Sequence, residues 1–428
     1  MRKNYLKECI ERLKTKFVLY IRALNLNVFK EKEKPEPAVT GISKKKAEAN
    51  RACRTQQLLD FLQTEYVFRY NSLTGVTEFR RRNEPEAPFY PMDHREMNGL
   101  IVEARLRGIE CWIYDVPTLV LSTLTDTYHP FHLYMNELPG WDGVDRITPL
   151  AHLISEDTVW MNGFHRWMLG MAAQWIGQES AHANALAPIL VSTEQGYNKS
   201  TFCKMLLPDS LQADYYLDKL NISTQTMPER KLTTCGLINL DEFDRIGENK
   251  IPELKNLMQM VSIHLYQGKM KGWCSKPRLA SFIGTTNKKQ ILSDPTGSRR
   301  FLCVELKKAI PEISLEHKQL YAQLKQELQQ GERSWLTKAE EQEVQQKNRE
   351  FYIQSPMEEA FYACFRSPGH DEKGEWLTAV ELYTRMQRRF KAAMRDSSPR
   401  KLCVKLVGIG WQPRHTRHGN RYHVVEIV

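Results

Sequence analysis

The sequence of residues 189–202 is Ile189-Leu190-Val191-Ser192-Thr193-Glu194-Gln195-Gly196-Tyr197-Asn198-Lys199-Ser200-Thr201-Phe202. An apolar run ends in a turn, and Lys199 then opens a helical pattern of apolar residues. This order of strand, loop and helix is typical of a phosphate-binding loop, in which backbone N–H groups and a lysine contact phosphate oxygens and a Ser or Thr hydroxyl holds Mg²⁺. The residues expected to contact a bound phosphate compound are Gln195, Gly196, Tyr197, Asn198, Lys199, Ser200 and Thr201.

The loop departs from the strict pattern G-x-x-x-x-G-K-[ST]. Thr193 and Asn198 stand where that pattern has its two glycines. Asparagine is the non-glycine residue that best tolerates a positive φ, so Asn198 is the least damaging replacement. An ordinary strand, turn and helix without a ligand remains the alternative.

Two carboxylates follow a second apolar run. Leu237-Ile238-Asn239-Leu240 has the pattern of a buried parallel strand, and Asp241-Glu242 comes directly after it. The carboxyl end of such a strand delivers side chains to the ligand crevice. We expect Asp241 to hold the hydration shell of Mg²⁺ and Glu242 to polarise an attacking water. The alternative is a solvated acidic turn.

Two further segments continue the pattern. The apolar run 279–286 ends at Asn287, which can orient the attacking water, although an asparagine that merely terminates a strand is common. The segment 294–301 contains Arg299 and Arg300 after a turn. Either arginine would suit a neighbouring subunit's γ-phosphate as an arginine finger, whereas a solvated loop is the plainer interpretation.

These blocks together resemble a known family. Their order and spacing are similar to the AAA+-related core of superfamily 3 helicases, and more closely to the virulence-associated protein E (VapE) family of phage and mobile-element ATPases. The matching blocks are Trp141-Asp142-Gly143-Val144-Asp145-Arg146-Ile147, the loop at 195–202, Phe282-Ile283-Gly284-Thr285-Thr286-Asn287, and Asp294-Pro295-Thr296-Gly297-Ser298-Arg299-Arg300-Phe301. The resemblance covers about residues 120–310 and departs from the family at Asn198.

The resemblance implies a fold, a cofactor and an assembly. It implies an α/β P-loop ATPase core that binds ATP and Mg²⁺, forms a homo-oligomer, expected to be a hexamer, and moves along single-stranded DNA. A hairpin in the segment 265–278 would grip that strand, with Lys269 and Lys271 on phosphates. The alternative for these two lysines is an exposed basic hairpin without a ligand.

The composition limits the classes of protein to which the chain can belong. The 428 residues are 41% hydrophobic and 26% charged, with a formal net charge of +10 and a pI near 9.0, which favours a polyanionic partner. The nine cysteines show no C-x-x-C pair and no zinc-ligand spacing, as expected for reduced thiols in the cytoplasm. No apolar stretch is long enough to span a membrane, and we expect no signal peptide.

Five segments follow from changes in composition. We expect a segment at 1–50 made of an amphipathic helix (1–28) and a charged linker (29–50), a lead-in domain at 51–125 with a hairpin over 68–79, the ATPase core at 126–310, and a helical connector at 311–355. We further expect a helix over 254–264 within the core and a helix beginning at Trp376 in the last segment.

The last segment, 356–428, has the order helix, helix and β-ribbon of a winged helix. Its recognition helix would carry Arg400, Lys401 and Lys405, and its wing would carry Arg414, Arg417 and Arg421. We expect these side chains to contact the phosphates of DNA, including duplex DNA. Winged helices also serve in subunit packing, so a basic protein-interaction module is the alternative.

The sequence thus predicts a DNA-dependent ATPase, a replicative helicase of a phage or mobile element, with a primase or another replication protein as partner. One alternative is a nucleotide-gated DNA-binding initiator or regulator with little ATP turnover, which the substitutions at the two glycine positions favour. The other alternative is a scaffold that has lost ATP binding, which Lys199 and Ser200 argue against.

Overall fold

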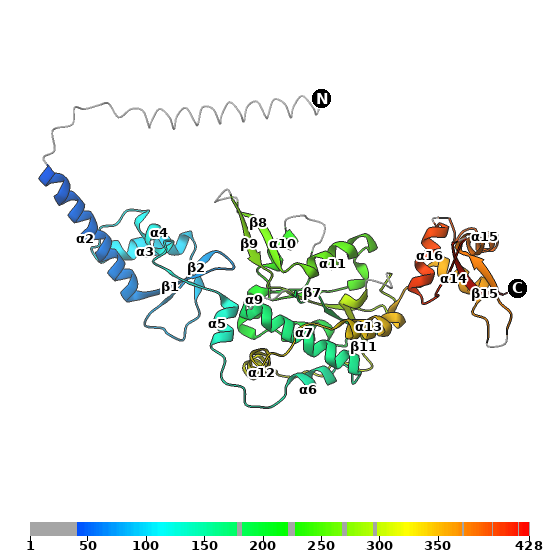
Figure 1. Cartoon of the computed structure of the whole chain (residues 1–428). Helices are drawn as coiled ribbons and strands as arrows, with labels where there is room; N and C mark the ends of the chain where they lie inside the picture. The colour runs from blue at the N-terminus through cyan, green and yellow to red at the C-terminus, as the bar shows by residue number, and fades with distance from the viewer. Residues whose placement is uncertain are drawn as a thin grey trace, which may run out of the picture. The chain divides into compact units, whose positions relative to one another are not determined.

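The structure is a computed structural model that describes residues 41–177, 182–220, 227–267, 272–293, 298–369, 372–395, 397–417 and 419–427. The predicted helix at 1–28, the predicted DNA contacts Lys269 and Lys271, and residues 294–297 lie outside these ranges. The chain divides into two compact units (Figure 1). The first contains the described residues up to Asp126, except for the turn Asn71–Gly75. The second contains that turn and the described residues from Thr127 onward. None of the helices in the described ranges is both long and apolar enough to cross a membrane.

The first unit contains the predicted hairpin. Its elements are α2 (Gly41–Glu65), β1 (Tyr66–Asn71), β2 (Val76–Arg81), β3 (Tyr90–Pro91), α3 (His94–Leu106) and α4 (Asp115–Val120). The strands form a sheet in the order β3-β2-β1-β4, in which β4 is Asp126–Tyr128, and the neighbouring β1 and β2 confirm the hairpin over 68–79. Helix α2 begins inside the segment predicted as a linker, so the prediction was wrong for residues 41–50. Lysine and alanine there are good helix formers.

The second unit begins with a large α/β core. Its elements are α5 (Pro130–Asn136), α6 (Ile147–His152), α7 (Thr158–Ile176), β5 (Ala187–Val191), α8 (Lys199–Met205), α9 (Asp209–Tyr215), β6 (Tyr216–Leu217), α10 (Met227–Leu232), β7 (Leu237–Leu240), η1 (Phe243–Arg245), η2 (Glu248–Lys250), α11 (Ile251–Gln259), β8 (Ser262–Gln267), β9 (Gly272–Pro277), β10 (Ser281–Thr286), η3 (Ser298–Arg300), β11 (Phe301–Glu305), α12 (His317–Gln329), α13 (Lys338–Lys347) and η4 (Asn348–Phe351).

A five-stranded sheet organises this core. Its strand order is β11-β5-β10-β7-β6, and each neighbouring pair is parallel. The register pairs Thr286 of β10 with Val191 of β5, and Gly284 with Leu240 of β7. The residues that follow these three strands therefore meet at one edge of the sheet. The α/β class predicted from the sequence is confirmed at this level.

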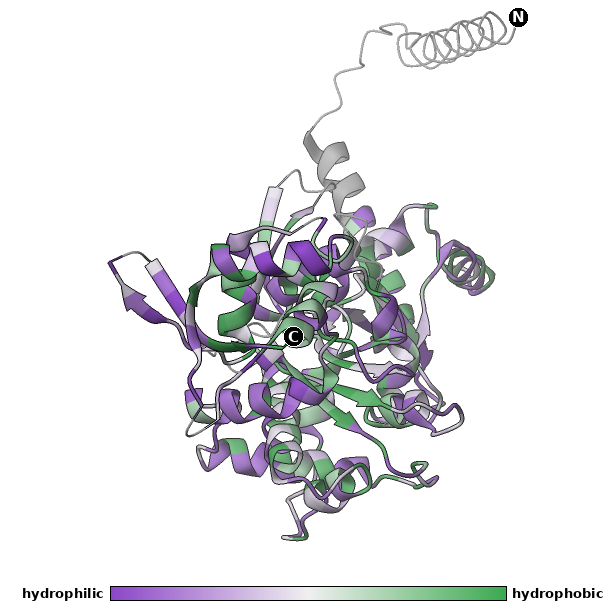
Figure 2. Ribbon diagram, turned by 90° about the vertical axis from the view of Figure 1, so that its right-hand side faces the viewer, coloured by the Kyte–Doolittle hydropathy of each residue, from purple (hydrophilic) through white to green (hydrophobic). Residues whose placement is uncertain are grey.

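Both faces of the sheet are covered, which explains why its strands are continuous apolar runs. On β5, Leu190 packs into a cluster with Trp167 of α7, whereas Ile189 and Val191 pack into a second cluster with Phe243. The two clusters lie on opposite faces because successive side chains of a strand alternate. Figure 2 shows the strands of the central sheet in the hydrophobic colour.

The segment predicted as a helical connector is packed more tightly than its composition indicates. Leu320, Tyr321 and Leu324 of α12 belong to the same cluster as α7, and all three are buried. The Tyr321 ring stacks on Trp175 with a centroid distance of 4.7 Å. The three residues form a narrow stripe at helical spacing, so α12 covers one face of the core.

A two-stranded hairpin leaves the core between α11 and β10. Strands β8 and β9 are antiparallel, with Gln267 opposite Gly272 at the described end. The hairpin is therefore confirmed for its two described strands, and residues 268–271 between them lie outside the described ranges. The helix predicted over 254–264 was wrong in its second half, because α11 ends at Gln259 and the following apolar residues pair with β9.

The chain ends in a small module with its own hydrophobic cluster. Its elements are α14 (Pro356–Cys364), β12 (Phe365–Arg366), β13 (Glu375–Thr378), α15 (Ala379–Arg389), α16 (Pro399–Gly408), β14 (Arg414–Thr416) and β15 (Gly419–Glu426). Strand β15 is antiparallel to β12, β13 and β14. The helix expected from Trp376 begins only at Ala379, because Trp376 pairs with β15 and Thr378 caps the helix.

Replacing Gly236 by Ala tests the packing beneath β7. A Cβ at this position would overlap the ring of Phe131, which is fully buried and packs against Trp175. We expect Gly236→Ala to lower the free energy of unfolding by about 1–3 kcal/mol, since overpacking displaces a confined side chain. Calorimetric melting measures this loss. Gly140→Ala is the matched control, because its Cβ would have no atom within 4 Å; equal melting of both variants would contradict the packing described.

Candidate functional site

The loop between β5 and α8 adopts a backbone conformation that glycine usually provides. Gly196 has φ 80° and Asn198 has φ 56°, both in the left-handed region. The Asn198 side chain also donates a hydrogen bond from Nδ2 to the carbonyl of Ile310 at 2.9 Å. Asn198 therefore adopts the left-handed φ that a glycine at this position would usually provide.

Lys199 lies at the centre of the site. Its side chain is buried, and Nζ donates hydrogen bonds to Oγ of Ser192 and to Oδ1 of Asn287, the latter at 2.8 Å. Burial lowers the pKa of this ammonium group, and the charge of Asp241 opposes that shift. Lys199 forms no ion pair with a carboxylate of the described chain. A buried cation held only by neutral groups is prepared for an anion.

Ser200 and Asp241 form an oxygen-rich group beside Lys199. Ser200 Oγ donates to Asp241 Oδ1 at 3.4 Å, and Thr285 Oγ1 donates to the same oxygen at 2.6 Å. A hydroxyl and a carboxylate are hard oxygen ligands of the kind that Mg²⁺ takes, alongside water and phosphate. Among the described residues no group of three or more His, Cys, Asp and Glu side chains could hold a metal ion. The residues present fit an ion shared with a bound phosphate.

Glu242 is held in a left-handed conformation with φ 55°. Its carboxylate pairs with Lys219 at 3.3 Å and with Arg245 at 3.0 Å. Asn198 and Glu242 are the non-glycine residues with positive φ in the described ranges, and both line this site. Such backbone strain persists where the surrounding structure imposes it, which is common at functional sites.

Sequence reasoning missed a second acidic group. Asp244 Oδ1 accepts a hydrogen bond from Thr286 Oγ1 at 2.8 Å, and Asp244 pairs with Lys288 at 3.2 Å. Burial alone would raise the pKa of the Asp244 carboxyl, but these two contacts outweigh it and hold the pKa below its usual value. The hydroxyl residues Thr285 and Thr286 at the end of an apolar strand were the sequence feature that could have pointed to Asp244, because they offer hydrogen-bond donors for a carboxylate.

These residues enclose one pocket of about 490 Å³. It is lined by Gln195, Gly196, Tyr197, Asn198, Lys199, Ser200, Thr201, Asp241, Glu242, Asp244, Arg245, Thr285, Thr286, Asn287 and Lys288. The structure therefore brings together the predicted loop, both predicted carboxylates and Asn287. Its volume lies within the range of small-molecule sites, about 300–1,000 Å³.

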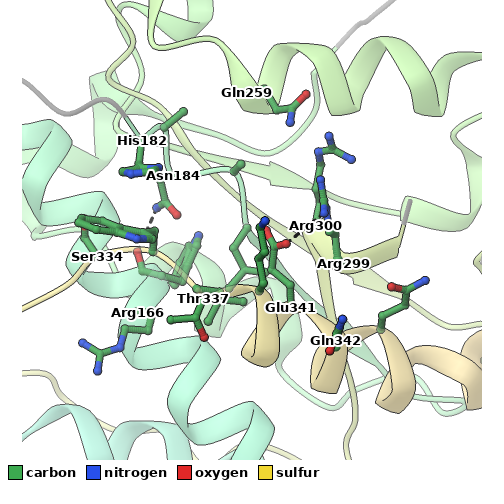
Figure 3. Close-up of a pocket in the computed structure, with 18 residues that line it drawn as sticks. Arg166, His182, Asn184, Gln259, Arg299, Arg300, Ser334, Thr337, Glu341 and Gln342 are labelled. Atoms are coloured by element: carbon green, nitrogen blue, oxygen red, sulfur yellow. Dashed lines mark hydrogen bonds and ion pairs between the residues drawn. The ribbon is translucent and has the colours of Figure 1, made fainter. Parts of the chain in front are cut away.

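Arg299 and Arg300 lie elsewhere. They precede β11, whose first residue, Phe301, pairs with Ala187 at the amino end of β5. They thus occupy the edge of the sheet opposite to Lys199. Both line a separate pocket of about 820 Å³, in which Arg299 pairs with Glu341 at 3.1 Å. Figure 3 shows the two arginines on one side of this pocket and Arg166 and His182 on the other.

The predicted DNA contacts are distributed over two elements. Arg400 and Lys401 lie in the first turn of α16, after the N-cap Ser398. Arg414 begins β14, and Arg417 follows that strand in the exposed turn before β15. On the core hairpin, Trp273 lies opposite Tyr266, next to the undescribed residues 268–271; it is exposed and packs edge-on against Tyr266 at 5.5 Å.

Comparison with known proteins gives two family matches. A model of the virulence-associated protein E-like domain matches residues 135–353, more than half of the chain. A model of a domain of unknown function from a B. Theta gene, DUF3874, matches residues 354–424. No match was found among curated proteins.

Among solved structures, the apo structure of the NrS-1 C-terminal region is 13% identical, with 72% of this chain and 74% of that chain covered and a TM-score of 0.40. An A-form apo structure of the same region is 14% identical, with 70% and 67% covered and a TM-score of 0.37. Since TM-scores below 0.5 describe only a loose likeness, the assignment rests on the family match.

Substitutions at Asn198 test whether the loop needs its left-handed residue. We expect Asn198→Ala to lower the free energy of unfolding by about 1–2 kcal/mol, because alanine is strained at this φ and the bond to Ile310 is lost. Asn198→Gly should cost less, since glycine adopts this φ without strain. Denaturant unfolding measures both, and a larger loss for Asn198→Gly would contradict this account.

Proposed function

Because the chain belongs to the virulence-associated protein E-like family, we propose that it is a DNA-dependent ATPase that acts as a replicative helicase of a phage or mobile element in the cytoplasm. The observation that carries this proposal is the convergence at one sheet edge of a buried lysine, Lys199, with the Ser200–Asp241 pair and Asn287. ATP hydrolysis needs a cation that binds phosphate, a pair of metal ligands and a polar group that orients the attacking water.

The chain's own residues supply the binding step. Lys199 would exchange its bonds to Ser192 and Asn287 for phosphate oxygens, which would give its buried charge a counterion. Ser200 and Asp241 would hold Mg²⁺, which neutralises phosphate charge when it is bound. Thr285 would keep Asp241 oriented through the hydrogen bond at 2.6 Å.

The hydrolytic step would depend on Glu242 and Asn287. Once released by Lys199, the Asn287 amide could orient a water molecule, and Glu242 would accept its proton as a general base. In the present structure Lys219 and Arg245 hold the Glu242 carboxylate. Both cations are largely exposed, so these pairs are weak enough to be exchanged for other contacts.

Two variants test the ATPase directly. We expect Lys199→Ala to abolish both ATP binding and turnover, and Glu242→Gln to keep ATP binding while lowering turnover about 100-fold or more. The measurement is the ATP hydrolysis rate with and without single-stranded DNA, together with nucleotide binding by calorimetry. Lys204→Ala is the matched control, a lysine on the exposed side of the same helix α8. Turnover that persists in Lys199→Ala would refute the assignment.

A nucleotide-gated initiator or regulator with little turnover is the second candidate. The observation that favours it is the pairing of Glu242 with two cations, which keeps the base engaged before any nucleotide arrives. Tight ATP binding by the unaltered chain, with negligible hydrolysis at every DNA concentration, would support this candidate over the helicase.

The arginine pair argues for assembly. Five residues of β5 separate the edge that carries Arg299 and Arg300 from the edge that carries Lys199, roughly 16 Å at strand spacing. Neither arginine would serve the site of its own chain, so we place the finger in the neighbouring subunit of a homo-oligomer, proposed to be a hexamer. In that assembly the finger would stabilise charge on the phosphate being transferred.

Mixing inactive variants tests this arrangement. We expect Arg299→Ala or Arg300→Ala to lose turnover while retaining ATP binding, and a mixture of that variant with Lys199→Ala to recover part of the activity. Recovery is expected because some interfaces then combine an intact loop with an intact arginine. The arginine whose loss is complemented is the finger. If neither mixture is more active than its components, an arginine acting in trans is excluded.

DNA would contact two regions. Lys269 and Lys271, at the undescribed tip of the β8–β9 hairpin, are proposed to grip a single strand in the core. The C-terminal module has the helix and strand order of a winged helix, and Arg400, Lys401, Arg414 and Arg417 are its proposed phosphate contacts. A primase acting in trans remains the proposed replication partner, and the five sequence segments remain the proposed domains.

A further inference from the structure

We propose that single-stranded DNA binds to the face of the C-terminal sheet that points away from the module's hydrophobic cluster, and that the bases of the DNA stack on Trp376 and His423. This inference rests on the proposed DNA contact of the same module and deepens it, because it names the strand form and the side chains that receive the bases. The surface is defined here as the stacking face and consists of Trp376, His423, Arg414 and Arg421.

The strand register places these four residues on one side of the sheet. On β15, Tyr422 and Val424 are buried in the module's cluster, so Arg421 and His423 point to the other face. Trp376 of β13 lies directly opposite His423, and Arg414 of β14 lies opposite Arg421.

Trp376 and His423 already form an aromatic stack. Their ring centroids are 4.6 Å apart and their planes differ by 6°. The guanidinium carbon of Arg414 lies 5.6 Å from the centre of the Trp376 ring. Trp376 is 39% exposed, although its large apolar ring would gain from burial. A base that joins this stack would cover the ring, and Arg414 could turn from the indole to the adjoining phosphate.

Charge on the two sides of the sheet is separated. Glu375 and Glu426 belong to the helix side by their register, and both carboxylates pair with Arg385 of α15, at 2.8 and 2.5 Å. The register places Arg414 and Arg421 on the stacking face. Besides the hydrogen bonds from Thr378, the charge of Arg421 also helps to lower the pKa of Glu381. Residues 356–428 contain 13 Lys and Arg residues against 8 Asp and Glu residues. The face therefore complements a polyanion.

Stacking selects single strands. In a duplex each base is covered on both faces by its neighbours, so an aromatic side chain on a sheet can reach bases only where the strand is unpaired. The competing explanation is that Trp376 and His423 are simply a stabilising cross-strand pair. Ligand binding separates the two explanations, because a purely structural pair would not affect affinity.

The chain offers a matched control for this experiment. Trp335 is 40% exposed and stacks on His182 with a centroid distance of 4.3 Å and an angle of 20°. Trp335 lies outside the C-terminal module, in the core, where it lines the pocket that contains Arg299 and Arg300. Trp335→Leu therefore removes an equally exposed indole from an equivalent histidine stack elsewhere.

The test compares the affinities of the full chain for fluorescein-labelled oligo(dT) and for a duplex of the same length. We expect Trp376→Leu to weaken oligo(dT) binding about tenfold, and to leave the duplex affinity within about twofold. His423→Ala should act in the same direction, and Trp335→Leu should change neither affinity. Circular dichroism melting of each variant checks that the module remains folded.

Photo-cross-linking locates the contact independently of affinity. An oligonucleotide that carries iododeoxyuridine should cross-link to peptides containing Trp376 or His423, as identified by mass spectrometry. Cross-links only to the 262–277 hairpin, or an unchanged oligo(dT) affinity in Trp376→Leu, would overturn the proposal.

The outcomes also separate this inference from the proposed function. If Arg414→Ala weakens both oligo(dT) and duplex binding while Trp376→Leu changes neither, the stacking proposal fails and the phosphate contact stands. If Arg414→Ala, Arg400→Ala and Trp376→Leu all leave binding unchanged, the module is not a DNA-binding element, and both proposals for it fail.

Discussion

The parallel pairing of β5, β10 and β7 is the constraint on which the rest of the molecule depends. The register of Thr286 with Val191 sets Asn287 beside the start of the loop, and the register of Gly284 with Leu240 sets Thr285 beside Asp241. The hydrogen bonds of Lys199 and Asp241 follow from these two alignments. A shift of either pair by one residue would turn each strand's side chains to the opposite face and separate these groups.

Two backbone positions beside that edge store strain. Asn198 and Glu242 both adopt left-handed φ values, which cost of the order of 1–2 kcal/mol for a residue with a side chain. At Asn198 the bond to Ile310 offsets part of this cost. At Glu242 the compensating contacts are ion pairs with exposed Lys219 and Arg245, which solvent screens. Glu242 is therefore the less firmly held of the two, which agrees with its proposed role as a general base.

Local patterns were sufficient for much of the site. The loop, Asp241, Glu242 and Asn287 each stand at the end of a continuous apolar run, so their neighbourhood follows from parallel strands alone. Asp244 and Lys219 were missed because their roles depend on cross-strand neighbours that no local pattern specifies. The helix over 254–264 was overextended for the same reason, since pairing with β9 converts its end into a strand. The sequence also left open where Arg299 and Arg300 lie, because that position depends on strand order.

The charge of the chain is distributed differently between the regions proposed to bind nucleotide and DNA. Residues 127–355, which contain the proposed phosphate site, have equal numbers of acidic and basic side chains, whereas the C-terminal module is basic. A neutral core can bind a compact anion through one buried lysine, where burial strengthens each contact. A polyanion instead needs several exposed cations, whose attraction is long-ranged and weakened by salt. We therefore expect most of the affinity for DNA to come from residues outside the core. The core, which would bind the nucleotide, should then control how nucleotide binding changes that affinity.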